Sequence, residues 1–131
     1  MESKEVCMTQ WDMERLRALI AVYGGDSADV LEEKLDRVRI VHPKDIPGDT
    51  ITMNSVVRIR YVDTGEEHTF ALVFPGNRIE TNAISVIARA GAALLGCREK
   101  DLVEWQIPAG KKRVQVLEVL YQPERMEKCY G

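Results

Sequence analysis

Two stretches of apolar residues with helical spacing occupy the first third of the chain. The first follows Thr9, whose hydroxyl can cap a helix start together with Asp12 three positions later. We expect this helix to begin near Gln10 and to end at Gly24-Gly25, because glycine adopts the backbone conformation that stops a helix. Its apolar face, with spacings of three and four, comprises Met13, Leu16, Leu19, Ile20 and Tyr23.

A second amphipathic helix is predicted directly after the two glycines. Asp26 or Ser27 can cap its start, and acidic residues in its first turn suit the positive end of the helix dipole. Because the turn is so short, the two helices are expected to form an antiparallel hairpin. The apolar positions of the second helix are Val30, Leu31, Leu35 and Val38.

Prolines and a glycine between residues 42 and 50 end the helical pattern. We therefore place a boundary there, with a helical hairpin in residues 1–44 and a second unit in residues 45–131. In the second unit apolar and polar residues alternate, which is typical of strands. The expected strands cover residues 57–61, 70–74, 84–88, 103–107 and 113–121, with one short apolar helix at 91–96.

The predicted fold class follows from this order of elements. A helical hairpin precedes a small, mainly antiparallel sheet with one short helix, which is an α+β arrangement. In the last strand the apolar phase shifts between Val116 and Leu117, and this shift predicts a β-bulge.

Composition and charge narrow the classes of function. Hydrophobic residues make up 45% and charged residues 30% of the 131 residues, a balance typical of globular proteins. The net charge is -3, and residues 1–50 hold 7 Lys or Arg against 11 Asp or Glu. Nucleic-acid-binding proteins usually carry a basic excess, so we expect no direct sequence-specific contact with nucleic acid.

The cysteines and the apolar runs indicate a cytoplasmic protein. Cys7, Cys97 and Cys129 are far apart, without metal-ligand spacing, which favours a reducing compartment over a disulfide framework. The first five residues have no apolar core, and no run approaches the roughly 18 apolar residues of a membrane span. We therefore expect neither export nor membrane insertion.

Few residues have the setting that catalysis or metal binding requires. His42 precedes a proline and His68 lies in a predicted strand, each without a second ligand nearby. Asp26 and Asp29 have a D-x-x-D spacing at the hairpin tip, where two carboxylates can share a hard cation or only support the helix start. We favour the second interpretation, and expect no catalytic residue, no bound metal and no cofactor.

Four short strings, in order, carry a resemblance to a known family. They are Thr52-Met53-Asn54-Ser55, Gly91 to Gly96, Trp105 to Gly110 and Leu117 to Pro123. Over residues 35–123 the chain resembles the regulators of nucleoside diphosphate kinase (Rnk), which are relatives of the bacterial Gre transcript-cleavage factors. One position departs from this pattern, because Arg89 stands where these relatives usually have proline.

The resemblance implies both a fold and a partner. The fold is an N-terminal antiparallel coiled coil followed by a domain like the FK506-binding proteins, and the partner is RNA polymerase, contacted at the rim of its secondary channel. Rnk-like proteins have a shorter coiled coil than Gre factors and are regarded as binding without stimulating transcript cleavage. The expected function is thus that of a monomeric, cytoplasmic transcription regulator that is not an enzyme.

Two alternative functions remain open from the sequence. A Gre-like cleavage factor would use Asp26 and Asp29 at the hairpin tip to hold magnesium. A prolyl isomerase, suggested by the fold, would need an open pocket lined by aromatic side chains. Aromatic residues are only 6% of the chain, and Phe70, Phe74 and Trp105 occupy alternating positions that more simply fill a core.

The expected docking residues lie in two of the four strings. Asn54 and Ser55 stand where the linker enters the sheet, and Ala90, Gly91 and Ala92 lie at the start of the short helix. Small residues let a partner's backbone approach closely, and the free amides of a helix start offer hydrogen-bond donors. Gly91 and Ala92 can equally serve only to pack the helix against the sheet.

Overall fold

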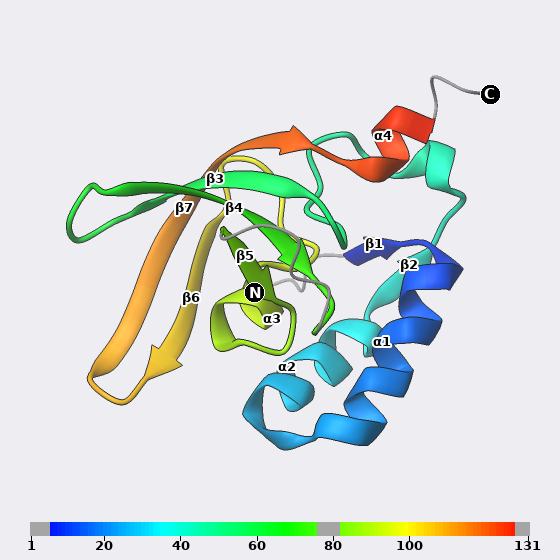
Figure 1. Cartoon of the computed structure of the whole chain (residues 1–131), viewed down its shortest axis with the longest axis horizontal. Helices are drawn as coiled ribbons and strands as arrows, with labels where there is room; N and C mark the ends of the chain where they lie inside the picture. Colours follow the sequence, from blue (N-terminus) through cyan, green and yellow to red (C-terminus); the bar gives the residue numbers. More distant parts are fainter. Residues whose placement is uncertain (1–5, 76–81, 128–131) are drawn as a thin grey trace.

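The structure, a computed structural model, describes residues 6–75 and 82–127. It begins with a short strand β1 (Val6–Met8), followed by the helices α1 (Gln10–Tyr23) and α2 (Gly25–Asp36). Figure 1 shows these two helices as a hairpin beside the rest of the chain. Both predicted bounds of the first helix are confirmed, and the backbone N–H of Asp12 donates to Thr9 Oγ1 at 3.2 Å, which is the expected cap.

The turn between the helices differs from the prediction. Gly24 and Gly25 both have positive φ, so the second helix starts one residue after the first one ends. Its N-cap is Gly24, without a side-chain hydrogen bond, so the predicted capping by Asp26 or Ser27 is wrong. Glycine reaches this conformation without the steric cost that other residues meet, but it has no side-chain oxygen to offer to the first amides of α2.

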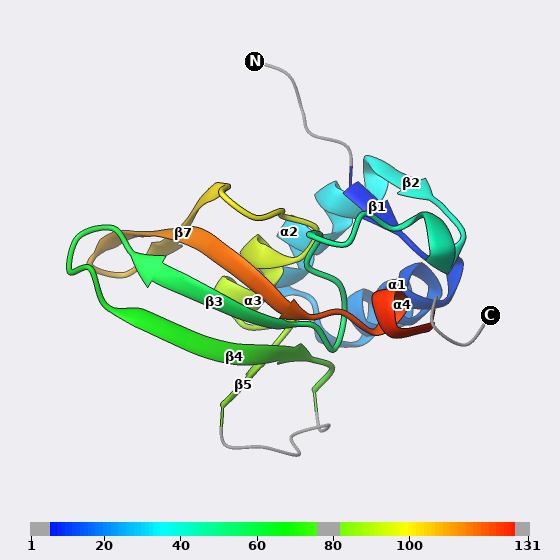
Figure 2. The ribbon, with the colours of Figure 1, turned by 90° about the horizontal axis from the view of Figure 1, so that it is seen from above.

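The larger part of the chain is a five-stranded sheet with the order β5-β4-β3-β7-β6. Neighbouring strands are antiparallel except β4 and β5, which are parallel, so the sheet is mixed and only mainly antiparallel. Figure 2 shows the sheet curling over the short helix α3. The bounds are β3 Val56–Tyr61, β4 Glu67–Val73, β5 Ala83–Ser85, β6 Leu102–Ile107, β7 Gly110–Tyr121 and α3 Arg89–Leu94.

The predicted bulge in the last strand is confirmed. Along β3, Arg58 is paired with Glu118 and Ile59 with Val116, so Leu117 has no partner across the ladder. A second shift leaves Leu120 unpaired in the same way. The extra residues let a twelve-residue strand bend around the core.

A two-stranded parallel sheet, which the hydrophobic pattern did not predict, joins the start of the chain to the segment after α2. It pairs β1 with β2 (Val38–Ile40). Val38 was expected on the apolar face of the second helix, but that helix ends at Asp36 and Val38 lies in β2. A three-residue strand is too short for its period to be recognised. Two further short helices, η1 (Pro43–Asp45) and α4 (Pro123–Glu127), lie next to each other.

One apolar core connects the hairpin with the sheet. Leu16, Leu31 and Leu35 of the hairpin belong to the same buried cluster as Met53 and Leu94 of the second unit. The predicted α+β fold is confirmed. None of the helices in the described part combines the length and the apolar character needed to cross a membrane. Cys7 and Cys97 are not joined in a disulfide, the Cys97 thiol donates to the Ala93 carbonyl at 3.3 Å, and Cys129 lies outside the described residues.

Candidate functional site

The two residues of the first predicted docking pair, Asn54 and Ser55, lie in different environments, one on the surface and one in the interior. Asn54 is exposed, has a left-handed backbone with φ of 69°, and donates its N–H to the Leu72 carbonyl at 2.6 Å. Ser55 is fully buried. Contact of Asn54 with a partner remains a prediction, whereas the Ser55 side chain has its partners within the chain.

Those partners form a buried polar cluster around the linker. Ser55 Oγ accepts from the backbone N–H of Thr52 and shares a hydrogen bond with Thr52 Oγ1, both at 2.9 Å. Thr52 Oγ1 also donates to Glu124 Oε1 at 2.7 Å. Buried Gln122 donates to two backbone carbonyls within residues 47–50, at 2.8 Å each. Buried hydrogen bonds therefore join the segment from Pro47 to Thr52 to the segment around Gln122 and Glu124 at the end of β7, so these polar side chains have a structural role.

The second predicted docking segment begins α3. Ala90 is half-buried, while Gly91 and Ala92 are buried. A Cβ added to Gly91 would lie 2.2 Å from the carbonyl oxygen of Ser85, a distance at which backbone must shift. The close approach at Gly91 is thus made by β5 of the same chain. A role of this segment in partner contact stays a prediction.

The hairpin tip carries the two acidic residues singled out in the sequence. Asp26 and Asp29 are both exposed. Asp26 Oδ2 lies 3.9 Å from the guanidinium of Arg89, which also donates to the carbonyl of Gln106 at 3.1 Å. Arg89, the residue that departs from the family pattern, therefore connects the tip with β6. In residues 6–75 and 82–127 no group of three or more His, Cys, Asp or Glu is arranged to hold a metal ion.

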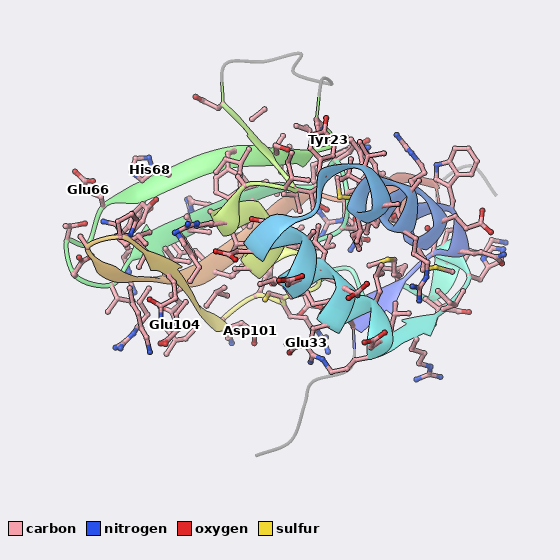
Figure 3. All side chains as sticks on the ribbon, turned by 90° about the horizontal axis from the view of Figure 1, so that it is seen from below. Tyr23, Glu33, Glu66, His68, Asp101 and Glu104 are labelled. Carbon is pink, nitrogen blue, oxygen red and sulfur yellow. The ribbon has the colours of Figure 1, made fainter. Side chains whose placement is uncertain are left out.

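A cleft of about 440 Å³ lies between α2, α3 and β6. We call it the interdomain cleft, because the boundary predicted from the sequence separates α2 from α3 and β6. It combines apolar side chains, Trp105 among them, with charged residues of both signs. Figure 3 shows this side of the molecule and labels Glu33 of α2 and Glu104 of β6. The lining residues are Asp26, Ser27, Val30, Glu33, Lys34, Arg37, Arg89, Ala92, Ala93, Glu104, Trp105 and Gln106.

Lys34 is the buried charged group of this cleft, with 8% of its surface exposed. Its ammonium donates to the carbonyls of Ala93 at 2.6 Å and of Leu95 at 2.5 Å, at the C-terminal end of α3. Burial lowers the pKa of Lys34 below its usual value of 10.5, because the charged form loses hydration there. The hairpin is thereby joined to α3 by a buried cation as well as by apolar packing.

Neither Lys34 nor the cleft was predicted from the sequence. One signal was present, because Lys34 lies between Leu31 and Leu35 in a helix whose other charged residues are mostly off the apolar face. Val30 and Tyr23, expected on apolar faces, are instead 41% and 54% exposed. His42 and His68 are both exposed, and His68 lies in β4, as the sequence predicted. Phe70 and Phe74 are buried in the core as expected, whereas Trp105 is half-buried and lines the cleft.

The chain is similar in sequence and in structure to known bacterial proteins. Residues 46–121 match the family described as transcription elongation factor, GreA/GreB, C-term. The regulator of nucleoside diphosphate kinase of Escherichia coli K12 is 38% identical over 129 residues, which is 95% of each chain. A GreA/GreB structure from Nitrosomonas europaea superimposes with a TM-score of 0.78 at 36% identity, covering 91% of this chain and all of that one. The transcription elongation factor GreA of Thermotoga neapolitana is 36% identical over 90 residues, but these cover only 57% of its length.

Proposed function

Since the chain belongs to the GreA/GreB family of transcription elongation factors, we propose that it is an Rnk-type regulator that docks at the secondary channel of RNA polymerase without cleaving the transcript. As a member of this family it is a transcription-associated regulator. The observation that carries the proposal is the similarity to an Rnk protein over 95% of both chains, hairpin included. The protein acts as a cytoplasmic monomer, without cofactor and without catalytic residues.

The size of the hairpin supports binding without cleavage. The first helix has 14 residues and is about 21 Å long at 1.5 Å per residue. The GreA relative matches over only 57% of its own length, so much of that protein has no counterpart in this chain. A hairpin this short has little reach into a channel.

The chemistry of the tip supports the same proposal. Cleavage assisted by a metal ion needs carboxylates that are available to the ion. One of the two tip carboxylates, Asp26, has the Arg89 guanidinium beside it at 3.9 Å. The positive charge opposes the arrival of a cation, so Asp26 and Asp29 make a poor magnesium site.

A backtracked transcription complex provides the direct test. Incubation with this protein and magnesium is expected to leave the transcript length unchanged. A true Gre factor added afterwards is expected to cut more slowly, because the two proteins compete for one site. Pull-down of core RNA polymerase by the tagged chain is the accompanying binding measurement.

The variant with Asn at both Asp26 and Asp29 is the control for residual chemistry. Shortened transcripts that disappear with this variant would show cleavage and contradict the proposal. Polymerase binding with a fully active Gre factor would place the docking surface elsewhere on the polymerase. Absence of polymerase from the pull-down would contradict the proposed partner itself.

A further inference from the structure

Lys34 has an unusual charge environment within the interdomain cleft. Its ammonium can donate three hydrogen bonds, and two of them go to the carbonyls of Ala93 and Leu95. It forms no ion pair with a carboxylate of residues 6–75 or 82–127. Cys97 and Glu33 favour its charged form, but burial has the larger effect and keeps its pKa below the usual value. An anion placed directly beside the ammonium would relieve the remaining cost of burying it.

The acidic residues of the cleft are already close to other cations. Glu33 lies 3.9 Å from Arg37, and Glu104 lies 3.8 Å from Lys111 and 3.7 Å from Arg113. Asp26 is likewise near Arg89, as described above. The lining thus holds three carboxylates, Asp26, Glu33 and Glu104, against three cations, Lys34, Arg37 and Arg89. Because these carboxylates already have cationic neighbours, Lys34 is the lining cation that can receive a single further carboxylate.

Most of the remaining lining residues are apolar, namely Val30, Ala92, Ala93 and Trp105, and two are polar, Ser27 and Gln106. The apolar lining residues come from three elements: Val30 from α2, Ala92 and Ala93 from α3, and Trp105 from β6. A volume of about 440 Å³ gives space for an apolar side chain next to a carboxylate. Lys34 is held by its two carbonyl partners, so it is already ordered before a ligand arrives.

We propose that the interdomain cleft binds an acidic side chain flanked by an apolar one, presented by a polypeptide segment of the polymerase, with Lys34 as the anchor for the carboxylate. This inference rests on the proposed function and adds the chemistry of the surface that is recognised. The cleft is built from both units, α2 on one side and α3 with β6 on the other, so neither unit binds this segment alone. The apolar side chain lies against Val30 and Trp105.

Val30 offers a test that leaves Lys34 and the core intact, because it is partly exposed on α2. Glu, Lys and Gln are all good helix formers, so the variants Val30→Glu, Val30→Lys and Val30→Gln are expected to fold alike. Affinity for purified core RNA polymerase is measured at constant salt. We expect Val30→Glu to bind about 10-fold more weakly than Val30→Gln, since added negative charge repels the acidic segment, and Val30→Lys to bind at least as tightly as Val30→Gln. Equal affinities, or the reverse order, would overturn the proposal.

A photocrosslinking experiment identifies the segment directly. A benzoylphenylalanine at Val30 is compared with one at Leu120, which is similarly exposed at 45% but does not line the cleft. Crosslinks from position 30 to a polymerase peptide that carries Asp or Glu next to an apolar residue, and none from position 120, support the proposal. Polymerase binding with no crosslink from position 30 overturns the cleft while leaving the proposed function in place. Failure of the unmodified chain to bind polymerase overturns both.

Discussion

The two sides of the short helix α3 differ in how closely the chain surrounds them. Toward β5, Gly91 is buried and a single added carbon would lie 2.2 Å from the Ser85 carbonyl oxygen. Toward α2, the same helix borders the interdomain cleft, and its last carbonyls receive the Lys34 ammonium. Small residues serve packing on the first side, whereas on the second they leave a surface that another molecule can reach.

The difference between the two sides shows which residues of the string Gly91 to Gly96 serve packing and which border the cleft. Gly91 and Ala92 were predicted to admit a partner because small residues permit close approach. At Gly91 the approach is made by the chain's own backbone. Ala92, which is buried, and Ala93, one residue beyond the predicted docking segment, both line the open cleft. The candidate contact surface on α3 therefore lies away from Gly91, on the side of the helix toward the hairpin.

The strongest test of the comparison removes the α2 side altogether. We propose that residues 45–123 fold without residues 1–44, because the sheet and the β5 side of α3 supply their own buried contacts. The fragment loses the packing of Leu31 and Leu35, each contributing roughly 1.5–3 kcal/mol of burial. Its Tm is therefore expected to fall by about 10 °C or more. Circular dichroism and thermal melting check this, and a molten or aggregated fragment beside a well-folded full chain would show that the two parts do not separate.

The next largest loss of stability is expected on the side of α3 that packs against β5. Gly91→Ala should lower the free energy of unfolding by about 3 kcal/mol, because the added Cβ overlaps backbone that has no space to move. Gly48→Ala is the matched control, since its Cβ would meet only the flexible Arg125 side chain at 3.3 Å. Urea denaturation measures both variants. Equal stability of the two would mean that α3 is not tightly held against β5.

On the side of α3 that borders the cleft, the buried Lys34 ammonium is expected to make stability depend on pH. Lys34→Met is expected to change the free energy of unfolding by about 1 kcal/mol or less near neutral pH, because the lost hydrogen bonds and the removed cost of burying a charge offset each other. The pKa of Lys34 is lowered in the folded chain, so between that pKa and 10.5 the unfolded chain binds more protons. Stability relative to Lys34→Met should therefore rise with pH in this window. Parallel stability curves of the two proteins up to pH 10.5 would contradict the burial of the ammonium.

The smallest effect is expected at the tip. Arg89→Gln removes a partly exposed ion pair with Asp26 and should cost about 0.5 kcal/mol or less. Its consequence is local, because Arg89 also donates to the Gln106 carbonyl. Hydrogen exchange in the first turn of α2 should become faster, while exchange in β3 and β7 stays unchanged. Unaltered exchange at the tip would mean that Arg89 does not restrain the hairpin.

Much of the fold could be predicted from local patterns. The helix from Gln10 to Tyr23 begins after its cap Thr9 and ends before Gly24, and both signals are confirmed. Its predicted apolar face packs against the core except for Tyr23, which is exposed. The bulge at Leu117 was visible as a shift of phase in the last strand. Features whose partners are distant in sequence were not predictable in this way. The parallel pairing of β1 with β2 joins residues 6–8 to residues 38–40, and three-residue strands carry no clear period.

The sequence by itself determined the hairpin helices, the main strands, the fold class and the family, because caps, periods and turns are local and the family strings are read directly. Only the tertiary structure decided what the recognised residues do. It directed Ser55 inward to Thr52, closed Gly91 against Ser85, and buried the Lys34 ammonium under the end of α3 beside an open cleft. Burial and access depend on which segments pack together in space, and the period of a single helix or strand does not contain that information.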